Sequence, residues 1–347
     1  MKKHRIAVVA GDGIGKEVVP EGQRVLEAAG RKFGFELAWD EKPWSCEHYA
    51  KHGEMMPKDG LESIRNHDAI FLGAVGFPGV PDHVSLWGLL IPIRRQFRQY
   101  VNLRPIRVFD GVPTPVVGAK PGMDFVVVRE NVEGEYSEVG GRFNRGFPDE
   151  MAVQESIFTR PGVTRILDYA FELAATRRGH VTSATKSNGI VHTMPFWDEL
   201  VAEAGARHPA VEWRQEHIDA LVAKIVLDPS RFDVIVGSNL FGDILSDLAA
   251  AVAGSIGITP AGNIDPTREF PSMFEPVHGS APDIAGQQKA DPTAAILSAA
   301  LLCDHLGLTE AAAAIEAAVT ADIEERTAGG TRTTSEIGDA IAKRAAG

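Results

Sequence analysis

Short apolar runs alternate with stretches of helical periodicity along most of the chain. Residues 6–10, 69–72, 125–128 and 234–236 are apolar runs with the length of a buried strand. Apolar positions recur with helical spacing over residues 17–30, 164–175, 197–206, 309–326 and 335–345, and the last two, rich in alanine, are expected to be surface helices. Strands that alternate with helices predict an α/β protein whose core sheet is largely parallel.

Two segments that are rich in proline and glycine, 104–123 and 253–282, interrupt this pattern. We expect the chain to pass between domains there. Residues 101–254 would then form a central domain, and residues 1–100 and 255–347 would join to form the other. A length of 347 residues agrees with two domains.

The charge balance narrows the range of partners. The chain carries 35 Lys and Arg against 47 Asp and Glu, a net charge of −12. A surface that binds nucleic acid needs clustered positive charge, so this balance argues against that partner. It is still compatible with a small anionic substrate held by a few arginines.

The cysteines and the apolar segments indicate the cellular compartment of the protein. Cys46 and Cys303 form no zinc motif and no disulfide framework, which favours a reducing compartment. The apolar run near the N-terminus is too short for a secretory signal. The longest apolar stretch, 294–303, is about half of what a membrane span requires. These features predict a cytoplasmic protein with no membrane partner.

The loop Gly11-Asp12-Gly13-Ile14-Gly15 joins the first predicted strand to the first predicted helix. A helix that begins after such a loop can hold a phosphate group, but a tight strand-to-helix turn explains the same residues. The glycine spacing does not match G-x-G-x-x-G, and the loop does not match a P-loop. The fingerprint of a Rossmann fold is therefore absent.

Asp243 and Asp247 are four residues apart, so their carboxylates leave one helix face a turn apart. Ile244, Leu245 and Leu248 are expected to face the core, which would keep both acids close to buried surface. Paired carboxylates in such a place suit Mg²⁺ or Mn²⁺. The alternative is a first helical turn whose acidic residues favour the helix dipole.

Three arginines are candidates for binding an anionic substrate. Arg94 ends the apolar stretch 89–93, Arg104 lies in Asn-Leu-Arg-Pro, and Arg129 directly follows the predicted strand 125–128. An arginine at the end of a strand in an α/β sheet lies where ligands bind, and a guanidinium group pairs with a carboxylate through two hydrogen bonds. Together they would suit a small dicarboxylate, whereas an ordinary surface ion pair is the alternative for each.

Lys186 and Tyr136 could transfer protons if they are buried among charges, and Lys186 could then have a lowered pKa. Structural roles are the alternative. The loop 275–283, rich in glycine and proline, carries His278, Ser280 and Asp283. Asp283 could accept hydrogen bonds from the hydroxyls of a ribose, or the loop could contain an Asx-type turn. A Ser/His/Asp triad lacks the G-x-S-x-G turn that it would need.

Five segments, in this order, resemble the β-decarboxylating dehydrogenase family, which includes isocitrate and 3-isopropylmalate dehydrogenases. They are GDGIGKEV (11–18), NLRP (102–105), VVVRENVEGEY (126–136), SNLFGDILSDL (238–248) and FEPVHGSAPDIAG (274–286). The resemblance covers nearly the whole chain. It implies the two-domain α/β fold of isocitrate and isopropylmalate dehydrogenases, which is not a Rossmann fold. In that fold the chain ends would form the cofactor-binding domain, and 101–254 would carry the substrate and metal residues and the dimer interface.

The resemblance also implies catalytic roles. Three arginines would bind the substrate carboxylates and three aspartates would bind Mg²⁺ or Mn²⁺, with a K⁺ requirement left open: Arg94, Arg104, Arg129, Asp219, Asp243 and Asp247. Lys186 would take the hydroxyl proton, and Tyr136 would protonate the enolate that decarboxylation leaves. Lys186 and Asp219 would serve the neighbouring subunit, which implies a homodimer with shared active sites.

A further set of positions is expected, from the same resemblance, to bind the cofactor NAD. They are Gly73, Ala74, Asn188, His278, Gly279, Ser280, Ala281, Asp283, Ile284 and Asp291. Asp283-Ile284 resembles the NAD-dependent members, because the NADP-dependent ones carry Lys-Tyr there and a carboxylate would repel a 2′-phosphate. Asp291 departs from the asparagine of many members, which offers an amide to adenine.

The segment 85–91 precedes Arg94, and in this family it meets the substituent at C3 of the malate skeleton. Trp87 and Leu90 are expected to line it. Trp87 stands where isopropylmalate enzymes carry a glutamate, and its indole could fill the space of a missing isopropyl group. SLWG, PDH (81–83) and CEHYAKHGEMMP (46–57) resemble the members that act on D-malate and tartrate. D-malate is therefore the favoured substrate, with tartrates as alternates.

Two other functions stay open from the sequence. The first is a 3-isopropylmalate dehydrogenase of leucine synthesis. The second is a non-catalytic subunit that regulates a heteromeric dehydrogenase, although the full set of lysine, tyrosine, arginines and aspartates argues against it.

Overall fold

The structure is a computed structural model that describes residues 2–254, 256–329 and 332–347. The chain divides into two compact units, of which the first comprises Met1–Gln99, Arg107–Pro115 and Ala253–Gly347. The second comprises Tyr100–Ile106 and Val116–Val252. Residues 107–115 thus belong to the first unit and not, as predicted from the segments rich in proline and glycine, to the central domain.

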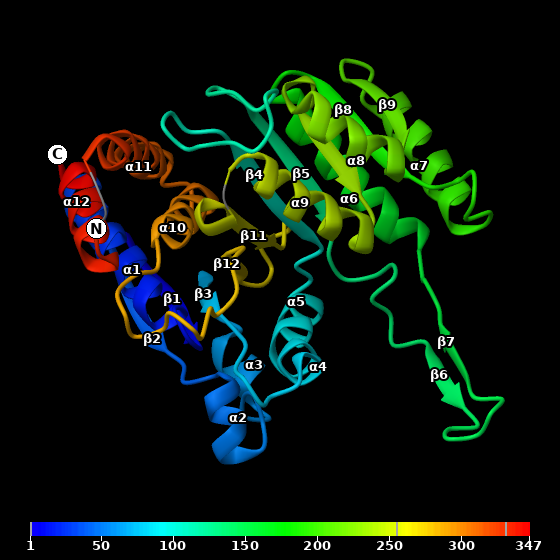
Figure 1. The fold of residues 1–347 in the computed structure, drawn as a ribbon, viewed down its shortest axis with the longest axis horizontal. Helices are drawn as coiled ribbons and strands as arrows, with labels where there is room; N and C mark the ends of the chain where they lie inside the picture. The colour runs from blue at the N-terminus through cyan, green and yellow to red at the C-terminus, as the bar shows by residue number, and fades with distance from the viewer. Residues whose placement is uncertain (1, 255, 330–331) are drawn as a thin grey trace. The chain divides into compact units, whose positions relative to one another are not determined.

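The strands of the first unit follow one another in the order β2-β1-β3-β12-β11. They are β1 (Lys2–Gly11), β2 (Phe35–Glu41), β3 (Ala69–Ala74), β11 (Pro260–Ile264) and β12 (Ser272–Pro276). β1 pairs in parallel with β2 and β3, and β12 pairs in parallel with β3 but antiparallel with β11. The helices of this unit, shown in Figure 1, are α1 (Gly15–Phe33), α2 (Cys46–His52), α3 (Gly60–Ile64), α4 (Asp82–Ser85), α5 (Ile91–Gln96), α10 (Thr293–His305), α11 (Thr309–Gly329) and α12 (Thr334–Ala346).

Alternate residues of β1 and β3 enter two different hydrophobic cores. Ile6 and Val8 pack with residues of α1, α10, α11 and α12 in one core. Ala7 and Val9 belong to the other core, which also contains residues of α2, α3 and α5. Because successive side chains of a strand point to opposite faces, this part of the sheet is covered on both faces. That explains why its strands read as continuous apolar runs.

The second unit has the strand order β4-β5-β10-β8-β9, in which β5, β10, β8 and β9 are parallel. These strands are β4 (Val101–Arg107), β5 (Asp124–Glu130), β8 (His180–Thr185), β9 (Glu212–His217) and β10 (Val234–Gly237). α6 packs with α7 and α8 with α9, and their bounds are α6 (Arg160–Ala175), α7 (Thr193–Arg207), α8 (Ile218–Leu227) and α9 (Asn239–Val252). Trp197, Phe125 and Phe171 are fully buried in this unit.

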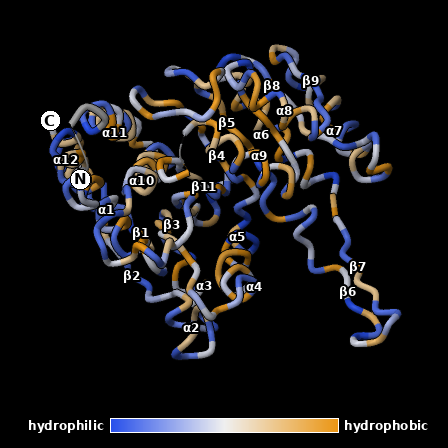
Figure 2. The backbone as a smooth tube through the Cα atoms, in the orientation of Figure 1, coloured by the Kyte–Doolittle hydropathy of each residue, from blue (hydrophilic) through white to orange (hydrophobic). Residues whose placement is uncertain are grey.

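A β-hairpin extends from the second unit. Its strands β6 (Gly140–Phe143) and β7 (Met151–Gln154) pair antiparallel with each other, and Figure 1 shows them reaching away from the other strands of this unit. Hydrophobic and hydrophilic positions are mixed along it (Figure 2). Phe143, Phe147, Met151 and Val153 are exposed, so the hairpin presents apolar side chains to its surroundings.

The structure confirms the strands and helices that the sequence pattern predicts. Each predicted strand lies within β1, β3, β5 or β10, and each predicted helix within α1, α6, α7, α11 or α12. The short helices around residues 46–64 and 82–96, helices α8 and α10, the hairpin and strands β2, β4, β9, β11 and β12 were not predicted, because their segments are short or lack a repeating apolar period. Within the described ranges, no helix combines the length and apolar character that crossing a bilayer demands.

Glu21 is a buried acid between two helices of the first unit. It lies on α1, which packs against α12, and Arg24 Nη2 donates to its Oε1 at 3.1 Å. Burial raises the pKa of Glu21 to about 7 from its ordinary value of 4.5, against the opposing effect of Arg24. The folded chain therefore holds this proton at pH values where an unfolded chain has released it. Stability from this group is present at low pH and is lost as the pH rises through about 7.

We predict that Glu21→Gln stabilises the protein in alkaline solution only. Because glutamine removes the ionisation of a buried carboxyl, the free energy of unfolding at about pH 8 should rise by about 2 kcal/mol, with little change at about pH 5. Urea denaturation at both pH values measures this. Glu36→Gln, an exposed position on β2, is the control and should show no such pH dependence; an equal gain at both pH values would contradict the assignment.

Candidate functional site

The second unit brings five of the predicted site residues together around one carboxylate, that of Asp243. Its Oδ1 accepts hydrogen bonds from Arg129 Nη1 and, at 3.5 Å, from Arg104 Nη2, and its Oδ2 accepts from Tyr136 Oη at 3.0 Å. Arg104 Nη1 also donates to Asp247 Oδ1 at 2.9 Å. Arg104 and Arg129 are only 8% and 2% exposed. Nearly buried guanidinium groups need anionic partners, and the two aspartates supply them here.

The aspartates lie in the second and third turns of α9, which begins at Asn239. The first turn carries no acidic residue, so the alternative in which these acids serve the helix dipole is wrong. Leu245 is buried as predicted, but Ile244 is 50% exposed. The expectation that Ile244 faces the core is therefore wrong: the helix turns it away from the face that packs on β5.

Gly242 allows α9 to lie directly on the stem of Arg129. A Cβ at this position would meet the Cβ and Cγ of Arg129 at 2.6 and 2.7 Å and its Cα at 3.0 Å. Since real Cβ atoms do not approach other atoms so closely, any side chain at 242 would push the helix away from β5. This close approach sets the position of Asp243, the next residue, relative to the arginine.

Two asparagines that sequence reasoning missed hold the arginines. Asn239 Oδ1 accepts from both Nε and Nη2 of Arg129, at 3.1 and 2.8 Å, and its Nδ2 donates to the carbonyl of Glu133 at 3.0 Å. Asn102 Oδ1 accepts from Arg104 Nε at 2.9 Å. Both asparagines are buried. The available signal was spacing: Asn102 precedes Arg104 by two on a strand, and Asn239 precedes Asp243 by four on a helix.

Two glutamates, Glu130 at the end of β5 and Glu135 beyond it, anchor the following turn and the start of α9. Glu135 accepts from Ser238 Oγ at 2.7 Å and from the Leu240 amide at 3.0 Å. Glu130 accepts from the amides of Val132 and Glu133 at 3.1 and 2.8 Å, and burial raises its pKa to about 7. These bonds fix the loop that carries Tyr136.

Lys186 and Asp219 pair with each other at 2.9 Å. They follow the ends of the adjacent parallel strands β8 and β9, in which Thr185 is paired with His217. The Lys186 side chain is 30% exposed, so it is less desolvated than the sequence suggested. The hydrogen bond from Lys186 lowers the pKa of Asp219 below its ordinary value. In the part of the chain that the structure describes, no three His, Cys, Asp or Glu side chains converge on a common metal position, so Asp219 does not join Asp243 and Asp247 within one chain.

The first unit holds the other predicted substrate residues. Arg94 is buried, and its Nη2 lies 3.0 Å from Glu275 Oε1, which also accepts from Asn263. Trp87 and Leu90 lie in a π-helical turn, Leu86–Leu90. The guanidinium group of Arg95 lies 5.0 Å from the centre of the Trp87 ring.

The predicted cofactor residues lie in loops and at strand ends. The Ser280 carbonyl accepts from the Ile14 amide at 2.8 Å. His278 Nε2 is buried and has no hydrogen-bond partner among the described residues, and burial lowers the pKa of this imidazole. Asp291 accepts from Thr293 at the start of α10 and from Arg326 Nη1 at 2.8 Å.

Other members of this predicted set have small or exposed side chains. Gly279, Asp283 and Asn188 are exposed, and Ala281 and Ile284 are half-buried. Gly73 is a packing position, because a Cβ there would lie 2.3 Å from the Ala10 carbonyl. Ala74 is buried beside it at the end of β3.

The glycine loop before α1 is a structural turn. Gly11 and Gly13 have φ values of 74° and 53°, and a Cβ on either would lie 2.0 Å from a backbone oxygen. Asp12 is fully buried and accepts from the amides of Cys46, Glu47 and Gly76 at 2.9, 3.2 and 3.2 Å. A buried carboxylate at its centre makes this loop a poor phosphate cradle, so the tight-turn interpretation holds.

Comparison with known proteins places the chain in a family. The model of the isocitrate/isopropylmalate dehydrogenase family matches residues 5–341, and the chain belongs to this family. It is 54% identical over 356 residues to the D-malate dehydrogenase (decarboxylating) of Escherichia coli (strain K12), with 99% of each chain covered. It is 53% identical over 351 residues to the tartrate dehydrogenase/decarboxylase of Pseudomonas putida, with 97% of this chain and 96% of that one covered.

Solved structures agree with this assignment. The crystal structure of isocitrate dehydrogenase from Methylococcus capsulatus is 33% identical and superposes with a TM-score of 0.88, covering 99% of this chain and 100% of that chain. The family resemblance and the fold class predicted from the sequence are thereby confirmed.

We predict that Gly242→Ala destabilises the protein. Alanine has the higher helix propensity by about 1 kcal/mol, so a net loss must come from crowding against Arg129, and we expect about 1–3 kcal/mol by urea denaturation. Gly189→Ala is the control, because a Cβ there would meet no atom closer than 3.9 Å. A Gly242→Ala protein as stable as the parent would contradict the close packing of α9 on β5.

Proposed function

We propose that this protein is a decarboxylating dehydrogenase that oxidises a small 2-hydroxy dicarboxylate with NAD⁺, D-malate being the main substrate and tartrates alternates. The observation that carries the proposal is the cluster in which Arg104, Arg129 and Tyr136 converge on Asp243. The names of relatives that are 54% and 53% identical over nearly the whole chain support the same chemistry.

The arginines favour a diacid. The guanidinium groups of Arg104 and Arg129 are each held at Nε by an asparagine, so their outer N–H groups keep a fixed direction. A carboxylate matches that planar fork with two parallel hydrogen bonds. Arg94 would bind a carboxylate as well, and Trp87 and Leu90 would line the space at C3, where the indole leaves little room for an isopropyl group.

A divalent cation fits the carboxylates. Asp243 and Asp247 lie one helical turn apart and offer oxygen atoms, the donors that Mg²⁺ and Mn²⁺ prefer. Among the residues that the structure describes, a single chain does not add a third ligand, and Asp219 of a second subunit would complete the set. When bound, such an ion would polarise the C2 hydroxyl and stabilise the negative charge that decarboxylation leaves on oxygen.

Lys186 and Tyr136 would move the protons. Lys186 would leave its ion pair with Asp219 and release one proton to solvent, and its neutral Nζ would then accept the proton of the C2 hydroxyl. After the C4 carboxylate leaves as CO₂, Tyr136 Oη would return a proton to C3 to form pyruvate. Its hydrogen bond to Asp243 Oδ2 at 3.0 Å already fixes the direction of this hydroxyl.

The loop 278–291 suits a dinucleotide. The buried Nε2 of His278 lacks a partner within the described parts of the chain, and a bound cofactor would supply one. Asp283 is exposed, and its carboxylate could accept from ribose hydroxyls but would repel a 2′-phosphate. Asp291 already accepts from Thr293 and Arg326, so it would shape the loop more than contact adenine. NAD⁺ would accept the hydride from C2.

The hairpin supports a homodimer with shared sites. Its exposed Phe143, Phe147 and Met151 are the kind of surface that an interface covers, and an isologous dimer would bury it twice. Lys186 and Asp219, which pair with each other instead of with the Asp243 cluster, would then act on the partner's substrate.

A substrate panel tests the proposal. With NAD⁺ and Mn²⁺ we expect kcat/KM for D-malate to exceed that for 3-isopropylmalate or isocitrate by at least roughly tenfold, because the pocket at C3 discriminates by size and charge. NADP⁺ should be a similarly poor replacement for NAD⁺. A preference for 3-isopropylmalate would overturn the substrate assignment, and no NADH from any of these acids would indicate a regulatory subunit.

Shared sites are tested by mixing inactive chains. Lys186→Ala and Tyr136→Phe homodimers should both lack turnover, but a heterodimer isolated through two affinity tags should regain about half of the parental activity. One of its sites combines an intact tyrosine with an intact lysine. A heterodimer of Lys186→Ala with the Lys186→Ala, Tyr136→Phe double variant is the control and should be inactive. If the first heterodimer were inactive too, each lysine would serve its own chain.

A further inference from the structure

The first unit contains a second concave site, which the proposed reaction does not use. A cavity of about 390 Å³ lies where β1 and β2 end and where α1 and α2 begin. Five basic side chains and one acidic side chain line it: Lys16, Lys42, Lys51, His48, His52 and Glu47. We call it the basic pocket. With the histidines neutral, three lysines against one glutamate still give this lining a positive charge, in a chain whose net charge is −12.

The acids near the basic pocket do not neutralise it. Lys16 pairs with Glu47 at 2.7 Å. Lys42 pairs with Asp40 at 3.0 Å, but Asp40 also pairs with Arg5 and contacts His67. Lys51 is exposed and has no ion-pair partner in the described ranges. The pocket therefore keeps an excess of positive charge.

The two histidines show the same crowding of positive groups. His48 and His52 lie one turn apart on α2, with ring centres 4.4 Å apart. The pKa of His48 is lowered by burial first and by His52 next, with Lys51 acting in the same direction and Glu54 against it. A bound anion would relieve this repulsion.

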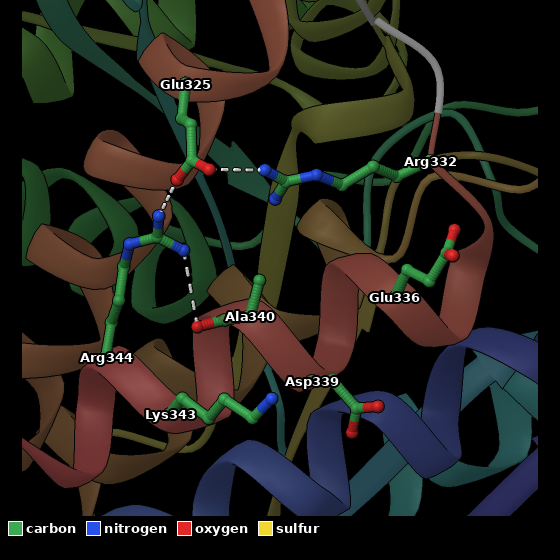
Figure 3. Close-up of a pocket in the computed structure, with 7 residues that line it drawn as sticks. All are labelled: Glu325, Arg332, Glu336, Asp339, Ala340, Lys343 and Arg344. Carbon is green, nitrogen blue, oxygen red and sulfur yellow. Dashed lines mark hydrogen bonds and ion pairs between the residues drawn. The ribbon is translucent and has the colours of Figure 1, made fainter. Parts of the chain in front are cut away.

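A second cavity of the same unit provides a contrast. It measures about 570 Å³ and lies on α11 and α12 (Figure 3). Three basic residues, Arg332, Lys343 and Arg344, face three acids. Figure 3 shows Glu325 between the two arginines, both of which bind it. Opposite charges are balanced there, whereas in the basic pocket they are not.

We propose that the basic pocket binds a phosphate group or short polyphosphate of a small molecule. The ammonium group of lysine is a compact point charge that binds phosphate without a fixed orientation, whereas arginine binds carboxylates or phosphates through a planar fork. The basic pocket is lined by lysines and histidines and by no arginine, while the Asp243 cluster uses arginines. The pocket is wide enough for more than one phosphate.

Calorimetric titration with inorganic pyrophosphate, in EDTA and at low ionic strength, tests this proposal without any turnover. Lys51→Gln should weaken binding about fivefold, the effect of removing one charge close to the ligand, and added salt should weaken it further. Lys343→Gln removes the same charge at the other cavity and should leave the affinity unchanged. ADP in place of pyrophosphate, with saturating NAD⁺ present to occupy the loop 278–291, distinguishes a nucleotide from a free polyphosphate.

Protection of individual lysines from chemical modification shows where the ligand binds. Pyrophosphate should protect Lys51, but not Lys343, from reductive methylation followed by mass spectrometry. Absence of binding by pyrophosphate and ADP at low millimolar concentration would overturn the proposal. So would equal weakening by Lys51→Gln and Lys343→Gln, or binding that leaves Lys51 unprotected.

Discussion

The constraint on which the rest of the structure depends is that strands buried on both faces can carry chemistry only where they end. β5, β8 and β10 are almost wholly buried, so charged side chains have no place along them except near their ends. Parallel strands end at the same edge. Arg129 at the end of β5, Lys186 after β8, Asp219 after β9 and Asn239 after β10 follow from that rule.

Burial of the arginines then decides which neighbours they need. A guanidinium group removed from water must have its N–H groups satisfied. Asn239 and Asn102 do this on one side of each arginine, and Asp243 and Asp247 on the other. Gly242 also helps to place these partners, because only a residue without a side chain lets α9 approach Arg129 so closely. The result is a site whose charged groups are oriented before any ligand arrives.

The hydrophobic pattern was sufficient to predict four strands, β1, β3, β5 and β10, and five helices, α1, α6, α7, α11 and α12, because continuous apolar runs and helical spacing both report burial. It could not predict the side on which Ile244 falls, since a helix in a layered fold can leave an apolar residue exposed. The cluster around Asp243 joins residues up to 143 positions apart. No local sequence pattern can predict that side chains so distant in the chain come into contact. Asn102 and Asn239 lie inside two of the segments that resemble the family. An uncharged amide does not by itself indicate a role in a site, and the role of each asparagine became clear only from its hydrogen bonds to an arginine in the structure.

The pairing of arginines with aspartates has a thermodynamic consequence. In the single chain each group is the counter-ion of the other. Under the proposed function, a diacid that bound alone would take both arginines and leave the two aspartates without a positive partner. A divalent cation that bound alone would take both aspartates and leave the two guanidinium groups without a negative partner. Arrival of both together restores neutrality for all four. Binding of the diacid must then raise the affinity for the metal, and binding of the metal must raise the affinity for the diacid by the same factor. The site would therefore fill mainly when both ligands are present.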